Sequence, residues 1–232
     1  MTGVQTCALP IFHDLPDPDL PGTSLTHERM VAMDQDRRQR LRRSGASWRL
    51  MTFSRVSEPM RKVRLHPSVS RWLSLIYDRP SVATNDLYFE YGSTQALHQD
   101  MAVFPIVPNN YLVGVWIAAE DIQADSGPLV YYPGSHKEPM WEGFPDYPQQ
   151  YLRTCSREQH DSYHKYLAEL ADAKYQRHRF LAKKGDVLFW HGMLVHGGEL
   201  ERNKDITRKS LVLHSIPAGC DVTSRLKGPF NW

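Results

Sequence analysis

Gly185–Gly198 reads GDVLFWHGMLVHGG and contains the two features that decide the fold prediction, a short strand and a histidine beside two glycines. Val187–Trp190 consists of β-branched, aliphatic and aromatic residues that follow a Lys-Gly-Asp turn, which is typical of a β-strand. His196 stands directly before Gly197 and Gly198, where the backbone can turn tightly and leave open space beside a metal. This stretch therefore predicts a β-rich domain with a candidate metal-binding imidazole.

The segments on either side of this stretch extend the β pattern. Apolar, β-branched or aromatic residues bounded by turn residues predict strands at Leu87–Tyr91, Leu112–Ala118, Leu129–Tyr132 and Ser210–Ile216. Helical patterns cover Ser24–Arg43, a segment that begins at His66-Pro67, and Ser156–Tyr175, where Ser156 and Gln159 form a candidate capping box. Helices followed by short strands with one helical insert predict a mainly β barrel or double-sheet jelly roll with supporting α-helices.

The length of 232 residues suits one domain with a short leading segment. We predict an irregular N-terminal segment at 1–23, because His13–Gly22 carries three prolines and no periodicity. Its first part, Met1–Ile11, resembles translated adapter sequence, so we treat it as non-native and exclude it from the fold prediction. A single domain is expected over 24–232, with its jelly-roll core at about 82–216.

Composition and charge exclude several classes of function. The 28 Lys and Arg residues nearly balance the 26 Asp and Glu residues, so nothing favours a nucleic-acid or membrane-surface partner. No apolar run approaches the roughly 20 residues that span a bilayer. The cysteines, Cys7, Cys155 and Cys220, include no CxxC pair, which argues against a disulfide framework or a thiolate zinc site and favours a reducing cytoplasm. The sequence does not indicate an oligomeric state.

Two imidazoles and one carboxylate form a candidate metal site. In His98-Gln99-Asp100, the first and third residues would point to the same side of an extended strand, so both side chains can reach one point. His196 offers a second imidazole from far along the chain. Two histidines and one carboxylate make the facial triad that holds non-haem Fe(II) and leaves coordination positions open. We therefore predict His98, Asp100 and His196 as metal ligands.

A basic residue strengthens this prediction. Arg208 lies twelve residues beyond His196, and Ser210 shares one face of the predicted strand with it. A guanidinium can bind a carboxylate through two hydrogen bonds, and a serine hydroxyl can donate a third. A dicarboxylate that chelates a metal at one end and binds Arg208 at the other has the geometry of bound 2-oxoglutarate.

Three segments together resemble the phytanoyl-CoA dioxygenase family of Fe(II)/2-oxoglutarate-dependent oxygenases. They are His98-Gln99-Asp100, Val115–Lys137 (VWIAAEDIQADSGPLVYYPGSHK) and Gly185–Gly198, and they occur in the family's order over roughly Asn85–Ile216. The resemblance implies a double-stranded β-helix, a cupin-like jelly roll. It also implies a dioxygenase that uses Fe(II), 2-oxoglutarate and O2, hydroxylates an unactivated C–H bond of a small molecule, and releases succinate and CO2.

Residue roles follow from the same resemblance. It implies His98, Asp100 and His196 as iron ligands, Arg208 as the 2-oxoglutarate clamp, and Trp116 and Asn85 as further co-substrate contacts. Ser210 matches an Arg-x-Ser pattern of related oxygenases. The family often has serine two residues after the second histidine, where this chain has Gly198, so a hydrogen bond near the iron is expected to be missing or supplied elsewhere. Halogenating relatives lack the carboxylate, so Asp100 argues against halogenation.

Two other readings of the same residues stay open. One is a metal-dependent jelly-roll isomerase or hydrolase with the same His/Asp/His set, which would not need Arg208. The other is a non-catalytic jelly roll that binds a small molecule. His160 and His164, spaced i, i+4 on the predicted helix, are interpreted as a surface pair, since no glutamate of an HExxH motif lies between them. Candidate substrate-facing residues are Tyr91, Gln99, Phe104, Tyr131, Trp141 and Trp190.

Overall fold

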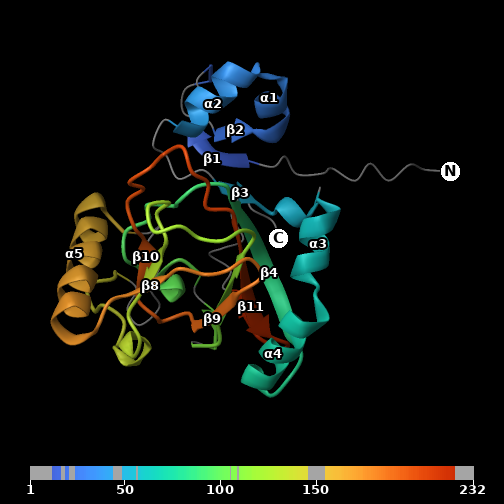
Figure 1. Ribbon diagram of the computed structural model, residues 1–232. Helices are drawn as coiled ribbons and strands as arrows, with labels where there is room; N and C mark the ends of the chain where they lie inside the picture. The colour runs from blue at the N-terminus through green and yellow to red at the C-terminus, as the bar shows by residue number, and fades with distance from the viewer. Residues whose placement is uncertain are drawn as a thin grey trace.

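A barrel of two facing β-sheets forms the centre of the molecule (Figure 1). The computed structural model describes residues 12–16, 19–20, 24–43, 49–55, 57–104, 106–108, 110–145 and 155–222. Among these, the larger sheet has seven strands in the order β2-β1-β3-β4-β11-β6-β9, and a smaller sheet has the order β10-β7-β8. The strands are β1 (Phe12–Pro16), β2 (Ser24–Thr26), β3 (Arg49–Met51), β4 (Ser81–Phe89), β5 (Ile106–Val107), β6 (Val113–Ala118), β7 (Leu129–Tyr131), β8 (His178–Phe180), β9 (Val187–His191), β10 (His196–Gly198), β11 (Ser210–Pro217) and β12 (Asp221–Val222).

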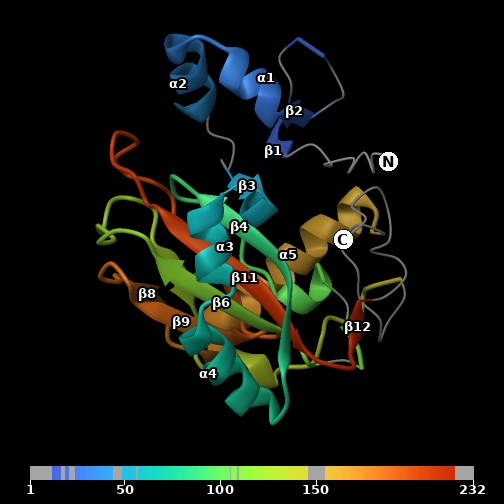
Figure 2. The same ribbon diagram turned by 90° about the vertical axis from the view of Figure 1, so that its right-hand side faces the viewer.

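Helices cover the barrel on two sides, α5 on one and α3 with α4 on the other (Figures 1 and 2). They are α1 (His27–Ala32), α2 (Gln35–Arg43), α3 (Glu58–Arg64), α4 (Pro67–Tyr77) and α5 (Arg157–Lys174), with short 3-10 turns η1 (Phe53–Arg55), η2 (Asp100–Ala102) and η3 (Ser135–Lys137). All the pairings within the larger sheet are antiparallel. The mainly β jelly roll with supporting helices is therefore confirmed.

Strand alternation separates the two faces of the larger sheet. Leu87, Val212 and Trp116 stand opposite one another on β4, β11 and β6, and all three are buried inside the barrel. Their neighbours in sequence point outward, where Leu213 and Val115 pack against α3 and α4. Successive side chains of a strand point to opposite faces. The same strand register therefore places one set of side chains in the inner core and the alternate set against the helices.

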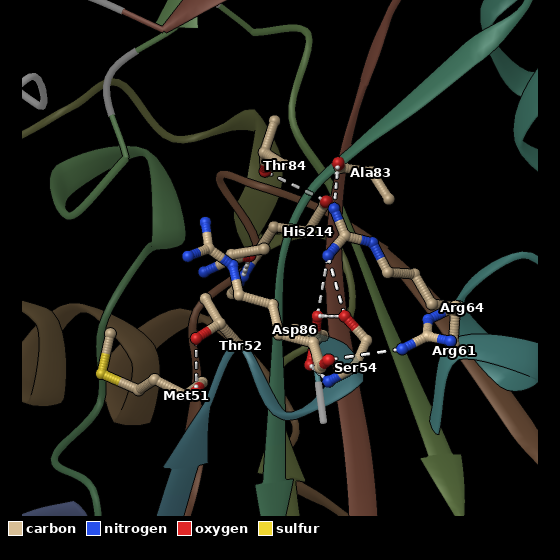
Figure 3. Close-up of polar contacts among 11 residues, drawn as sticks. Met51, Thr52, Ser54, Arg61, Arg64, Ala83, Thr84, Asp86 and His214 are labelled. Atoms are coloured by element: carbon tan, nitrogen blue, oxygen red, sulfur yellow. Dashed lines mark hydrogen bonds and ion pairs between the residues drawn. The ribbon is translucent and has the colours of Figure 1, made fainter. Parts of the chain in front are cut away.

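A buried ion pair fixes α3 and η1 to the outer face of β4 (Figure 3). Asp86 is fully buried, and its carboxylate accepts hydrogen bonds from the Arg64 guanidinium at 2.8 Å and from the Ser54 backbone N–H at 2.9 Å. Arg64 also donates to the Ala83 carbonyl at 2.8 Å. Each charged group therefore has several partners, which is the condition under which a buried charge is tolerated.

Helix α5 begins at the capping box that the sequence predicts. The Ser156 hydroxyl accepts from the Gln159 backbone N–H, and the Gln159 side chain accepts from the Ser156 N–H. The buried face of the helix belongs to one hydrophobic cluster with residues such as Met101, Leu112 and Val195. This face consists of Tyr163, Leu167 and Ala171. The helix lies beside β8 and β10 of the smaller sheet (Figure 1).

Three sequence predictions about the N-terminal half need correction. Phe12–Pro16 forms strand β1, so the predicted irregular segment 1–23 is wrong at these residues, and Met1–Ile11 lies outside the described residues. Ser24–Arg43 is two short helices after a strand, because Asp34 caps the second helix through its carboxylate. On α4, the helical period predicts one apolar face of Val69, Trp72, Leu73 and Ile76, but Trp72 and Ile76 are exposed, since Val69, Leu73 and Tyr77 make the buried face. No helix in the described part of the chain is long and apolar enough to cross a membrane.

Candidate metal centre

The structure brings His98, Asp100 and His196 together inside the barrel. One candidate ligand atom from each residue lies within 4.8 Å of the other two. The two histidine Nε2 atoms are each 3.6 Å from Asp100 Oδ1. Backbone hydrogen bonds between His98 and His196, at 2.9 and 3.1 Å, form an isolated β-bridge that joins two segments almost a hundred residues apart. His98 is therefore held by this single bridge, and Asp100 begins η2, so the predicted extended strand at His98–Asp100 is wrong.

Each imidazole is oriented by a backbone carbonyl. His98 Nδ1 lies 2.8 Å from the Ala96 oxygen, and His196 Nδ1 lies 2.9 Å from the Leu194 oxygen. Because a carbonyl only accepts, both Nδ1 atoms carry the proton and both Nε2 atoms keep a lone pair. Burial lowers the pKa of His196 to about 4, so its ring is neutral at pH 7, the form that binds a metal.

The Asp100 carboxylate is held from its other side. Trp190 Nε1–H donates to Asp100 Oδ2 at 2.7 Å, and His214 Nε2 lies 3.4 Å from the same oxygen. Burial alone would raise the pKa of Asp100, but the neighbouring imidazoles of His196 and His214 hold it well below its usual value. The carboxylate is therefore ionised, and its Oδ1 atom remains available as a metal ligand beside His98 and His196. A metal-ligating carboxylate is typically fixed by such outer hydrogen bonds.

A β-bulge in β4 places Asn85 beside His214. The β4–β11 register shifts between His214 and Ser215, so Thr84 is the extra residue, and Asn85 stands opposite His214 inside the barrel. The Asn85 amide oxygen lies 2.7 Å from His214 Nδ1, and Phe104 packs on the same imidazole with ring centroids 4.6 Å apart. Bulges often redirect side chains next to functional sites.

One cavity of about 420 Å³ contains this cluster. Apolar side chains from β4, β6, β9 and β11 make much of its wall. The residues that line it are Arg49, Met51, Asn85, Leu87, Phe89, Ser93, Gln95, Ala96, His98, Asp100, Val103, Phe104, Trp116, Leu129, His160, His164, Trp190, His196, Arg208, Val212 and His214. An apolar cavity with a few convergent polar groups is the usual form of a small-molecule site.

Arg208 places a buried cation in the same cavity. Its side chain is 2% exposed, and the guanidinium lies between the rings of Phe89 and Trp116, 5.5 and 5.7 Å from their centroids. Among the described residues no carboxylate forms an ion pair with it, Nε has no hydrogen-bond partner, and Nη2 reaches the Tyr91 carbonyl at 3.5 Å. Burial lowers the pKa of Arg208 to about 10, so it stays charged at neutral pH. The Glu201 carboxylate acts on this charge only through space, without a direct ion pair. A buried cation without a direct partner is costly unless an anion binds it.

The remaining predicted residues lie close to Arg208 or to the cluster. Trp116 and Asn85 line the cavity, whereas Ser210 is fully buried in the barrel wall, its hydroxyl lacks a partner among the described residues, and it does not line the cavity. At Gly198, a Cβ would lie 2.5 Å from Ser93 Oγ, so a serine does not fit there without movement of Ser93. Ser93 lines the cavity and brings a hydroxyl to this place.

Sequence reasoning missed several cavity residues. Among the candidate substrate-facing residues, Phe104 and Trp190 line the cavity, whereas Tyr91, Gln99, Tyr131 and Trp141 do not. His160 and His164 also line it, which corrects their interpretation as a surface pair. The Ser210–Pro217 alternation could have placed His214 inward, but no sequence signal identifies Ser93.

The fold and the cluster define a cupin-like jelly roll with a candidate mononuclear metal site inside the barrel. Residues 25–210 match the family model for phytanoyl-CoA dioxygenase (PhyH). The chain therefore belongs to the phytanoyl-CoA dioxygenase family of Fe(II)/2-oxoglutarate-dependent oxygenases.

Curated relatives agree with this family. The peroxisomal phytanoyl-CoA dioxygenase of Bos taurus is 33% identical over 128 residues, which cover 55% of this chain and 35% of that protein. Phytanoyl-CoA dioxygenase 1 of Oryza sativa subsp. japonica is 29% identical over 170 residues, 70% of this chain and 53% of that protein. The chain thus spans about a third to a half of the length of these relatives.

Solved structures share the fold. The non-haem alpha-ketoglutarate-dependent carbocyclase SnoK from nogalamycin biosynthesis superposes with a TM-score of 0.60 at 19% identity, over 88% of this chain and 83% of that chain. EctD from S. alaskensis with bound Fe gives a TM-score of 0.58 at 14% identity, over 75% of this chain and 58% of that chain. At these identities the likeness establishes the jelly-roll fold.

Proposed function

We propose that this protein is an Fe(II)- and 2-oxoglutarate-dependent dioxygenase that hydroxylates an unactivated C–H bond of a small molecule. One observation carries the proposal. The His98, Asp100 and His196 cluster and the unpaired Arg208 guanidinium line a single cavity. Family membership supports the same activity. A metal-dependent isomerase or hydrolase would use the cluster but leave the buried charge of Arg208 without a function.

The residues present fit a ferrous ion. His98 and His196 direct unprotonated Nε2 atoms toward Asp100 Oδ1, and each ring is fixed through Nδ1. Two imidazoles and one carboxylate leave positions open for a chelating co-substrate. When bound there, iron would supply the centre at which O2 is activated. Trp190 would keep the carboxylate oriented, since it donates a hydrogen bond to its other oxygen.

Arg208 fits the distal carboxylate of 2-oxoglutarate. The apolar side chains of Leu87, Val212 and Trp116 form the wall beside it and suit the co-substrate's methylene carbons. Arg208 would donate hydrogen bonds to the carboxylate. Ser210, two residues along β11, has a buried hydroxyl without a partner among the described residues, and this hydroxyl would have to turn toward the cavity to act as a second donor. Trp116 and Phe89 would shield this pair from water. Ser93 would supply the hydroxyl that Gly198 lacks.

The proposed reaction conserves atoms and electrons. 2-Oxoglutarate loses CO2 and takes one oxygen atom of O2 to become succinate, and the substrate C–H takes the other and becomes C–OH. The two oxidations together supply the four electrons that reduce O2. The apolar cavity would exclude water from the reacting groups, and Phe104, Val103 and Met51 would contact the substrate.

A small-molecule substrate fits a cavity of about 420 Å³. We propose that the protein acts in the cytoplasm, which the low cysteine content supports. We propose no nucleic-acid or membrane partner, because the net charge is only +2.

Succinate release tests the proposed function without a known substrate. Purified protein is incubated with Fe(II), 2-oxoglutarate and O2, and succinate is measured over time, followed by a screen of candidate substrates that accelerate it. We expect slow succinate formation in the wild type and in His178→Gln, a control on β8 outside the cavity, and none in Asp100→Ala. Undiminished succinate formation in folded Asp100→Ala, or none in any protein tested, would overturn the proposal.

A further inference from the structure

Helix α5 brings two more imidazoles to the wall of the cavity. His160 and His164 are one helical turn apart and both line the cavity that contains His98 and His196. His160 is partly exposed, with 45% of its side chain accessible, and His164 is half-buried against Leu97. Residues four apart on a helix face the same side, so the two rings meet rather than diverge.

Both rings are turned so that their Nε2 atoms converge. His164 Nδ1 lies 2.9 Å from the Leu97 carbonyl oxygen, which only accepts, so this nitrogen carries the proton and Nε2 keeps its lone pair. His160 Nδ1 lies 3.6 Å from the Asp161 carboxylate. The two Nε2 atoms are 3.3 Å apart. A carbonyl behind Nδ1, as at His164, is an arrangement that orients histidines bound to a metal, whereas His160 Nδ1 makes no hydrogen bond to any residue that the structure describes.

The distance between the two Nε2 atoms matches shared coordination. Two nitrogens bound to one tetrahedral zinc ion at about 2.0–2.1 Å are roughly 3.3–3.4 Å from each other. Burial also lowers the pKa of His164, so its lone pair is available at neutral pH. Nearby positive charge is neutralised, because Arg157 pairs with Asp161 and Lys165 pairs with Glu169.

We propose that His160 and His164 form a second metal site, selective for divalent transition metals of the zinc class and distinct from the His98, Asp100 and His196 cluster. With two protein ligands it keeps open positions, filled by water or by a hydroxyl or carboxylate of a molecule in the cavity. Any such metal would lie on the side of the cavity formed by α5, and one hydrogen bond links its ligand His164 to Leu97, the residue before His98. The inference is independent of the proposed function, since it needs neither 2-oxoglutarate nor O2.

Zinc stoichiometry tests the second site directly. Equilibrium dialysis of the full chain against Zn(II), without co-substrate, should give two ions per wild-type chain and one per His160→Gln chain. His160 is the better residue to change, because it is partly exposed and donates to no backbone group that the structure describes. His178→Gln, on strand β8, is the matched histidine control and should keep two ions.

A spectroscopic readout separates metal binding from a simple hydrogen bond between the rings. Zn(II) should shift the imidazole nitrogen resonances of His160 and His164 in the wild type, and those of His98 and His196 in both proteins. One zinc ion per wild-type chain, or two in folded His160→Gln, would overturn the proposal. In that case the 3.3 Å contact is an N–H···N hydrogen bond from His160 to His164.

Discussion

Trp190 donates its indole N–H to Asp100 Oδ2 at 2.7 Å, a contact between strand β9 and the first residue of η2. The bond occupies one carboxylate oxygen and leaves Oδ1 toward His98 and His196. Trp190 also packs against the His196 ring, with centroids 5.0 Å apart. A single indole therefore fixes the directions of two of the three candidate ligands.

Removal of this N–H should weaken metal binding more than folding. Trp190→Phe keeps an aromatic ring but leaves Asp100 Oδ2 without its short hydrogen bond, and loss of such an outer contact typically costs about 10–100-fold in metal affinity. Competition titration with a metal chelator measures the effect. Trp72→Phe is the matched control, because Trp72 is 59% exposed on α4 and should leave the affinity unchanged. Equal affinities for wild type and Trp190→Phe would contradict the positioning role.

Gly114 leaves space for the same indole. A Cβ at this position would overlap the Trp190 ring, so Gly114→Ala should displace it or strain β6. Overpacking of a core typically costs about 1–3 kcal/mol. We expect a lower free energy of unfolding in urea and a parallel loss of metal affinity. An unchanged unfolding midpoint would show that the barrel accommodates the methyl group and that the close approach has no energetic role.

Arg208→Ala should separate co-substrate binding from metal binding. Loss of one partner of a buried charge pair costs roughly 2–5 kcal/mol, which corresponds to about a 30-fold or larger rise in the 2-oxoglutarate concentration needed for half-saturation. Metal affinity should change little, because Arg208 contacts none of the three candidate ligands. Isothermal titration with 2-oxoglutarate, and separately with Co(II), measures both. A comparable loss of Co(II) affinity would count against the clamp role.

The Asp86 network should contribute stability rather than activity. Asp86→Ala leaves Arg64 and Ser54 without their carboxylate, and breaking a buried pair in this way typically costs about 3–5 kcal/mol. Urea unfolding should show this loss. Lys165→Ala, which breaks an exposed i, i+4 pair with Glu169, is the control and should leave the free energy of unfolding unchanged within error. Wild-type stability in Asp86→Ala would contradict the structural role of the network.

The sequence supported the fold prediction because strand alternation and turn residues are local signals. Val187–His191 and Ser210–Pro217 were expected as strands within about one residue, and the Ser156–Gln159 capping box formed as predicted. The sequence predicted that the His98 and His196 side chains bind one metal, but not that their backbones pair. The isolated β-bridge that joins them depends on loop geometry, and the spacing of apolar residues in the sequence does not indicate loop geometry.

The remaining site residues depend on long-range packing. Ser93 reaches the cavity from a loop. Its hydroxyl can occupy this position because Gly198 has no side chain there. Asn85 contacts His214 because a bulge at Thr84 changes the register of β4, and bulges have no reliable sequence signal here. The place of His160 and His164 on the cavity wall depends on how α5 packs against Leu97. These features required the three-dimensional structure.

Anaerobic titration with Fe(II) and 2-oxoglutarate tests the central claim most directly. We predict a visible metal-to-ligand charge-transfer band that saturates at one equivalent of Fe(II), is lost in Asp100→Ala, and requires far more 2-oxoglutarate in Arg208→Ala. Absence of the band in the folded wild type, or its persistence in Asp100→Ala, would contradict the assignment of His98, Asp100 and His196 as the iron ligands.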